Sequence, residues 1–170
     1  MSRSTSSTRP TSRHVIQELL TAAFVCAVNA RISRSGAIHP GQLRTSDQQV
    51  GVRTRLGGHT PDAMTDTALE RLLHDSPSVP DPREAALDIF VNLAKAQPFE
   101  DGNKHTALFV ANSLLLGLRT GELLTIPVDE QNPSLADSFN NLLARAYFFG
   151  DCVGVKHLLR EYGLTPLKAT

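Results

Sequence analysis

The sequence predicts a single all-α domain with one small β-hairpin. Apolar residues recur at helical spacing in several segments of residues 13–162, and helix start signals precede several of them. Only residues 50–56 alternate in the manner of a strand. With 170 residues and 41% hydrophobic content, the chain can bury one core, and no repeat or linker divides it. We expect a disordered tail over residues 1–12 and one domain over residues 13–170.

The first expected helix covers about residues 13–33. Ser12 can cap its start and Gly36 can end it. The segment that follows, residues 37–62, is the most irregular part of the chain. Within it the alternation over residues 50–56 predicts a strand or hairpin, the only β-structure that we expect.

Local signals predict the helices that follow. A short helix should cover residues 65–75, with leucines facing inward. Asp81 is a cap, a proline follows it, and Glu84 stands three residues later, which is the pattern of a capping box. The helix that begins there should reach Gln97.

The most apolar helix should run from Asn103 to about Leu118. It is apolar nearly all round, which is typical of a central buried helix. Another helix should begin at residues 132–133 and reach Phe149. The last helix should cover residues 151–162, and residues 126–128 should be a plain connector.

The charge and the cysteines narrow the function classes. Lys+Arg and Asp+Glu are both 17, which argues against a nucleic-acid or acidic-membrane partner. No segment has the length of a membrane span or the pattern of a secretory signal. Cys26 and Cys152 lack paired spacing and sit among apolar neighbours, so we expect small core residues in a reducing compartment, the cytoplasm. A solvated face explains the scattered early arginines better than a basic patch: Arg31, Arg34, Arg44, Arg53 and Arg55.

The most informative segment is residues 97–106, QPFEDGNKHT, between two predicted helices. Gly102 and Asn103 stand where a helix begins, and free N–H groups at a helix start favour phosphate. Lys104 adds a positive charge, and Asn103 adds an amide donor. Asp101 beside an anion makes sense if Mg²⁺ bridges its carboxylate and the phosphates. The segment therefore predicts a site for a Mg²⁺-bound di- or triphosphate.

A plain helix–turn–helix corner is the alternative explanation. Pro98 and Gly102 would then be turn residues, and Asp101 would cap the second helix. A phosphate-binding P-loop does not fit, because the required upstream glycine is absent and no strand leads into the segment.

Residues 97–106 resemble the active-site loop of the Fic/Doc (Fido) family, His-x-Phe-x-(Asp/Glu)-(Gly/Ala)-Asn-(Gly/Lys)-Arg. The Asn-Lys pair is more similar to the Doc branch than to the Gly-Arg form. The chain departs from the pattern at Gln97, in the histidine slot, and at His105, in the arginine slot. The resemblance implies a Fido-like helical domain, with a flap at about residues 43–58 before the motif loop.

The resemblance also implies a reaction and a set of roles. Members transfer AMP from ATP, or in Doc a phosphate, to a Ser, Thr or Tyr hydroxyl of a protein target docked on the flap. Asp101 would bind Mg²⁺. The cofactor-binding set would be Phe99, which anchors the loop in the core, Gly102, Asn103, Lys104 and His105. No glutamate here precedes glycine or asparagine, so the family's inhibitory (Ser/Thr)-x-x-x-Glu-(Gly/Asn) motif would come from an antitoxin-like partner, unless the site needs no restraint.

The two departures concern catalysis. Gln97 has no proton equilibrium near neutral pH, so it cannot be the general base, and losing such a base costs about 10²–10⁴-fold in rate. His105 is either a weakened phosphate contact or a displaced base. Three hypotheses remain: a transferase with weak or lost activity, a catalytically silent Fido-fold binding or regulatory module, and a scaffold without a nucleotide site. Engineered silencing of a toxic enzyme at residue 97 would leave the same sequence.

Overall fold

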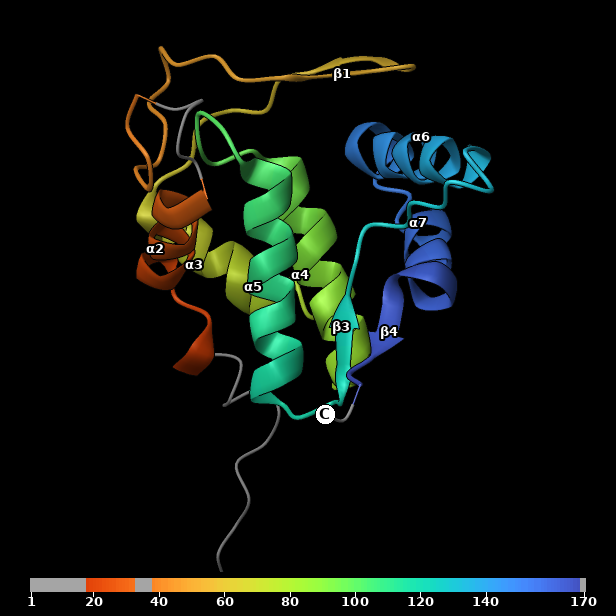
Figure 1. The fold of residues 1–170 in the computed structure, drawn as a ribbon. Helices are drawn as coiled ribbons and strands as arrows, with labels where there is room; N and C mark the ends of the chain where they lie inside the picture. Colours follow the sequence, from red (N-terminus) through yellow and green to blue (C-terminus); the bar gives the residue numbers. More distant parts are fainter. Residues whose placement is uncertain (1–17, 33–37, 169–170) are drawn as a thin grey trace, which may run out of the picture.

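The fold is built around two adjacent helices. The computed structural model describes residues 18–32 and 38–168. Helices α4 (Pro82–Ala96) and α5 (Asn103–Gly117) run side by side through the middle of the molecule, joined by the segment that contains the motif (Figure 1). Both are apolar on most of their surface, and α5 is the central buried helix that the sequence predicts.

The other helices flank this pair. Helices α2 (Ala22–Ile32) and α3 (Asp66–Asp75) lie on one side, while α6 (Ser134–Phe149) and α7 (Val153–Leu158) lie on the other (Figure 1). One continuous core joins them, in which Phe90 and Phe139 stack at 6.3 Å between ring centroids. The all-α prediction is confirmed.

A β-hairpin covers one end of the α4–α5 pair. Strands β1 (Val52–Thr54) and β2 (Gly57–His59) are antiparallel, with Val52 opposite His59. The hairpin extends over the loop between α4 and α5 towards α6 (Figure 1). This confirms the small hairpin that the sequence predicts before the motif.

A second strand pair was not expected. Strands β3 (Glu122–Leu124) and β4 (Leu164–Pro166) pair antiparallel, so the expectation of a single β-segment was wrong. The predicted last helix is also shorter, because α7 passes into a π-helical turn, Leu159–Gly163, that leads into β4. Each strand has three residues and its partner is some forty residues away, so neither leaves an alternating pattern in the sequence.

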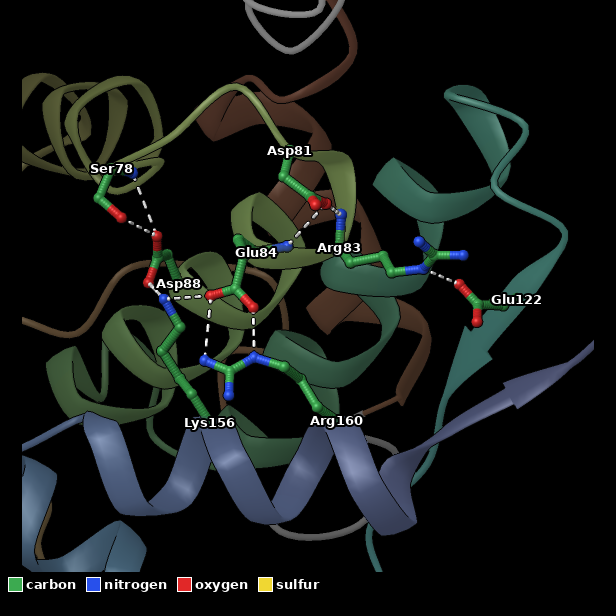
Figure 2. A network of polar contacts seen from close by, with 8 residues as sticks. All are labelled: Ser78, Asp81, Arg83, Glu84, Asp88, Glu122, Lys156 and Arg160. Carbon is green, nitrogen blue, oxygen red and sulfur yellow. Dashed lines mark hydrogen bonds and ion pairs between the residues drawn. The ribbon is translucent and has the colours of Figure 1, made fainter.

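Local caps set the helix starts. The Thr65 hydroxyl accepts the amide of Ala68 at the start of α3, and the Asp81 carboxylate accepts the amides of Arg83 and Glu84 at the start of α4. The Glu84 side chain does not complete the capping box. Glu84 instead pairs with Lys156 and Arg160, and Asp88 pairs with Lys156, in an ion-pair network between α4 and the segment of α7 and its π-helical turn (Figure 2).

The N-terminal helix differs from the prediction. Residues 1–17 and 33–37 lie outside the described residues, and with them the expected tail, helix start and helix end. In the described part, residues 18–19 are helical, the helix is interrupted at residues 20–21, and α2 follows. The break has a physical cause: the Thr21 hydroxyl accepts the amide of Phe24 at 3.1 Å, and Glu70 accepts the amide of Ala22 at 2.7 Å.

The cysteines and the helix lengths bear on the expected environment. Cys26 and Cys152 are partly buried against the core, and burial raises the pKa of both thiols. Over residues 18–32 and 38–168, every helix is too short or too polar to cross a membrane.

Candidate functional site

A cavity of about 770 Å³ lies where the hairpin, the motif loop and α6 meet. Three segments far apart in the sequence form its walls. The hairpin contributes residues 50–55, the loop and the start of α5 contribute residue 97 and residues 100–105, and one face of α6 contributes the rest. The lining residues on α6 are Asp137, Asn140, Asn141, Leu143, Ala144 and Tyr147.

The start of α5 opens directly onto this cavity. Gly102 precedes the helix with φ of 73°, a conformation that glycine adopts without strain, and its carbonyl accepts the first helical bond, from Thr106 at 2.8 Å. Among the described residues no side chain caps this helix start. Asp101 is therefore not a cap, and the plain-corner alternative fails on this point. The amides of residues 103–105 remain available to a ligand.

The charged residues of the motif surround this helix start. Asp101, Lys104 and His105 all line the cavity. The described residues contain no cluster of three His, Cys, Asp or Glu side chains that could enclose a metal ion. A Mg²⁺ ion that takes one carboxylate and completes its shell with phosphate oxygens and water needs no such cluster. Asp101 fits that arrangement.

Phe99 and Asn103 fix the path of the loop. The Phe99 ring is 1% exposed in the core and does not line the cavity. The Asn103 side chain bonds across the loop, accepting the Phe99 amide and donating to the Phe99 carbonyl, both at 2.8 Å. This corrects the expected role of the Asn103 side-chain amide, because it holds the loop. Its backbone N–H still belongs to the open helix start.

Gln97 ends α4 in a left-handed conformation, with φ of 48° and ψ of 54°, which is uncommon for a residue other than glycine. Its side chain is 4% exposed, and its amide donates to the Ala94 carbonyl at 2.6 Å. Gln97 lines the cavity, but its side-chain NH₂ group donates to the last turn of its own helix.

Arg44 is buried at the base of the hairpin, and its assignment to a solvated face was wrong. It is 4% exposed, and its Nε donates to the Gln97 carbonyl at 2.7 Å. Its two Nη groups donate to the carbonyls of Gln48, Pro61 and Asp62. One guanidinium thus joins the hairpin's two ends to the end of α4.

Asn29, on α2, is a second buried residue that the sequence analysis missed. It is fully buried and its amide is fully used. Nδ2 donates to the Asp101 carbonyl at 2.9 Å and to the Thr106 hydroxyl at 3.1 Å, and Oδ1 accepts the Gly41 amide at 2.9 Å. An asparagine in a helical stretch gives no sequence signal of such contacts.

Glu100 ties the motif loop to the segment before the hairpin. Its carboxylate accepts the amides of Ile38 and His39, both at 3.0 Å, and the side-chain amide of Gln48. The hydrogen bond from the His39 backbone lowers the pKa of the Glu100 carboxyl. Glu100 lines the cavity, but its negative charge is already used by these donors.

Contacts with α6 hold the hairpin over the cavity. The His59 ring stacks on Tyr147 at 4.9 Å, and its Nε2 lies 2.7 Å from the Lys95 carbonyl. Arg55 and Asp137 form an exposed ion pair at 3.5 Å. Burial raises the pKa of Tyr147, so its phenol is neutral at physiological pH.

The comparisons with known proteins agree with this architecture. A crystal structure of BepC, a VirB-translocated effector protein from Bartonella tribocorum solved with bound AMPPNP, is similar with a TM-score of 0.55. Sequence identity is 16%, and the match covers 87% of this chain and 76% of that one, which shows a shared fold. No curated protein matches the sequence. The model of the Fic/DOC family matches residues 19–115, more than half of the chain. The chain therefore belongs to the Fic/DOC family.

Proposed function

We propose that the cavity binds a nucleotide polyphosphate with Mg²⁺ and delivers AMP or phosphate to a hydroxyl of a protein segment beside the hairpin, with weak or lost activity. The uncapped start of α5, open to the cavity, is the observation that carries this proposal. Family membership and the fold shared with a protein crystallised with AMPPNP support it.

The charges around the cavity match such a ligand. Of its three carboxylates, Glu100 is held by backbone amides and Asp137 by Arg55. In residues 18–32 and 38–168, the Asp101 carboxylate has no such partner, so it remains for Mg²⁺. The amides of residues 103–105 and Lys104 remain for phosphate oxygens, with His105 as a further contact. A bound Mg²⁺ would neutralise phosphate charge.

Two transfers are compatible with this site. In nucleotidyl transfer, the target hydroxyl oxygen bonds to the α-phosphorus, and the bond to the bridging oxygen breaks to release pyrophosphate. In phosphoryl transfer, the oxygen bonds to the γ-phosphorus and ADP leaves. Either way the hydroxyl proton must be lost. Gln97 cannot accept it, so the proton passes to solvent or to His105.

A catalytically silent binding module is the second candidate. The specific observation in its favour is the bond from the Gln97 amide to the Ala94 carbonyl, together with the burial of that side chain. These contacts make Gln97 a helix-ending residue. Such a protein would bind the nucleotide, or a partner or an antitoxin-like inhibitor at the hairpin, and modify nothing.

Calorimetry with Mg²⁺–AMPPNP tests the binding that both candidates share. We expect saturable binding to the wild type, weakened in Asp101→Asn. The Asp137→Asn variant is the matched control, because Asp137 lines the same cavity but already has a partner, and it should bind much more like the wild type. If the wild type shows no binding, the transferase and the nucleotide-binding module both fail, and a partner-binding module or a scaffold without a nucleotide site remains.

Radiolabelled ATP separates the two candidates. Label from the α-phosphate on protein would indicate nucleotidyl transfer, and label from the γ-phosphate a kinase. If the wild type is silent and Gln97→His transfers label, the silence is local to residue 97. If that variant is also silent, His105 or the hairpin is a further defect and the binding-module proposal is favoured.

A further inference from the structure

We infer that Asn29 is a positioning residue that holds the start of α5 in its phosphate-binding geometry. This inference rests on the proposed function, because it assigns Asn29 a role in forming the same site. The residue is on α2, far from the motif in sequence, and does not line the cavity.

The contacts of Asn29 bracket residues 102–105, the turn at the start of α5 that lines the cavity. Its Nδ2 donates to the carbonyl of Asp101, directly before Gly102, and to the hydroxyl of Thr106, directly after His105. Both atoms lie within about 3 Å of one amide nitrogen, at 2.9 and 3.1 Å. One side chain therefore fixes both ends of the turn that supplies the free amides.

The third contact makes the position of Asn29 itself rigid. Its Oδ1 accepts the Gly41 amide at 2.9 Å, and a side chain at residue 41 would collide with α2, since a Cβ there would lie 2.6 Å from the Cβ of Ala30. The Asn29 amide thus has partners for both donors and its acceptor while fully buried. It cannot rotate without losing several hydrogen bonds.

This arrangement matters for binding because an ordered turn loses less conformational freedom when a ligand arrives. The bond to the Asp101 carbonyl fixes the peptide plane that enters Gly102, whose φ of 73° is available to glycine among several others. Without that bond, the Asp101–Gly102 turn samples more conformations and its amides do not converge. Nucleotide affinity should fall accordingly.

An asparagine that bonds to backbone groups can also matter only for stability, and the half-buried Asn112 provides the control. Asn112, on α5, also makes two-way bonds to backbone, accepting the Leu124 amide at 2.6 Å and donating to the Leu124 carbonyl at 2.8 Å. It lies outside the cavity lining. Asn29→Ala and Asn112→Ala should both lower the melting temperature.

Calorimetry with Mg²⁺–AMPPNP below those melting temperatures then separates the two roles. Asn29→Ala should bind about fivefold more weakly than the wild type, the equivalent of one net hydrogen bond, while Asn112→Ala binds as the wild type does. Equal affinity in Asn29→Ala and the wild type, or equal weakening in both variants, would overturn the inference.

A milder pair of variants protects the test against misfolding. Thr106→Val removes the hydroxyl that accepts from Asn29 and keeps the shape of the side chain, whereas Thr106→Ser keeps the hydroxyl. The valine variant should bind nucleotide more weakly than the wild type, and the serine variant should bind it as the wild type does. The opposite order, or no difference between them, would contradict the positioning role.

Order parameters of the amides of residues 102–105, measured without nucleotide, keep this inference distinct from the proposed function. We expect rigid values of about 0.85 in the wild type and clearly lower ones in Asn29→Ala. If the wild type binds no nucleotide, the proposed function fails, and a loss of order in Asn29→Ala still supports the structural role. Unchanged order would overturn the inference whatever the calorimetry shows.

Discussion

Gln97, which the sequence resemblance aligns with the family's histidine, makes several structural contacts. Its carbonyl accepts from Arg44, its amide donates to Ala94, and its backbone is left-handed. Any residue placed here must adopt this conformation, since it turns the chain from α4 into the loop. In Gln97→His the bond from the side-chain amide to the Ala94 carbonyl is lost, and the imidazole must fit the same left-handed backbone.

Asn103 provides a stability prediction at the residue scale. Asn103→Leu removes both bonds to Phe99 and leaves a buried N–H and a buried carbonyl without partners. We expect a loss of about 2–4 kcal/mol in the free energy of unfolding, measured with urea. The control, Asn140→Leu on the exposed face of α6, should stay within about 0.5 kcal/mol. A loss in Asn103→Leu no larger than in the control would contradict the role of Asn103.

The sequence allowed part of the site to be predicted at this scale. Gly102, Asp101 and Lys104, which the sequence analysis singled out, line the cavity. They could be singled out because glycine and charge at a helix start have a local physical meaning. The burial of Asn29 and Arg44 was missed, because most of their partners lie far away in the sequence. A polar residue in a helix or an irregular segment is usually exposed, and only the fold shows that these two are buried.

One guanidinium, that of Arg44, ties the two ends of the hairpin to the end of α4. Arg44→Lys keeps the charge but replaces a planar fork with a compact ammonium, which cannot reach the carbonyls of Gln97, Gln48 and Pro61 together. We expect a loss of about 1–3 kcal/mol in the free energy of unfolding. Hydrogen exchange should speed up more in the hairpin than in α5.

Arg55→Lys is the matched control for this prediction. Arg55 lies at the hairpin turn, and its only described ion pair, with Asp137, is exposed on both sides. Exposed pairs contribute about 0–1 kcal/mol, so exchange in the hairpin should change little. If the two variants behave alike, Arg44 does not anchor the hairpin.

The ion-pair network of Glu84, Asp88, Lys156 and Arg160 should make the free energy of unfolding depend on pH (Figure 2). A hydrogen bond from Arg160 lowers the pKa of Glu84. Burial acts to lower the pKa of Lys156, but its bonds to Asp88 and Glu84 outweigh this and raise it. The Glu84 contribution is present above the unfolded pKa, about 4.3, and is lost as pH falls through the lower folded value. The Lys156 contribution is present below its unfolded pKa, about 10.4, and is lost as pH rises through the higher folded value.

Glu84→Gln tests this account. It should lower stability at pH 7 by about 1 kcal/mol and make the acid side of the pH–stability curve shallower, as measured by urea unfolding between pH 3 and about 8. Glu130→Gln, at an exposed turn residue, is the control and should leave the curve unchanged. An acid limb identical in wild type and Glu84→Gln would refute the contribution of Glu84.

The elements that could be predicted are those with local signals. The starts of α3 and α4 follow from Thr65 and Asp81, whose side chains cap the adjacent amides. The break before α2 and the β3–β4 pair depend on partners across the molecule, namely Glu70 for the break and strand pairing for β4. No periodicity within a few residues reports such contacts.

At the scale of the molecule, the cavity depends on the packing of separate parts of the chain. The motif loop lies at one end of the α4–α5 pair, and α6 and the hairpin form the other walls of the cavity (Figure 1). Asn29 joins the start of α5 to α2, and Arg44 joins the end of α4 to the hairpin. A ligand bound at the start of α5 should therefore contact groups whose positions are set by the whole fold.

The most direct test is a titration of ¹⁵N-labelled protein with Mg²⁺–AMPPNP, followed by amide chemical shifts. The amides of residues 102–105 should move first and furthest, and saturate together, while those of β3, which lie outside the cavity lining, stay in place. Shifts that are absent at residues 102–105, or that are no larger there than in β3, would contradict phosphate binding by the first turn of α5.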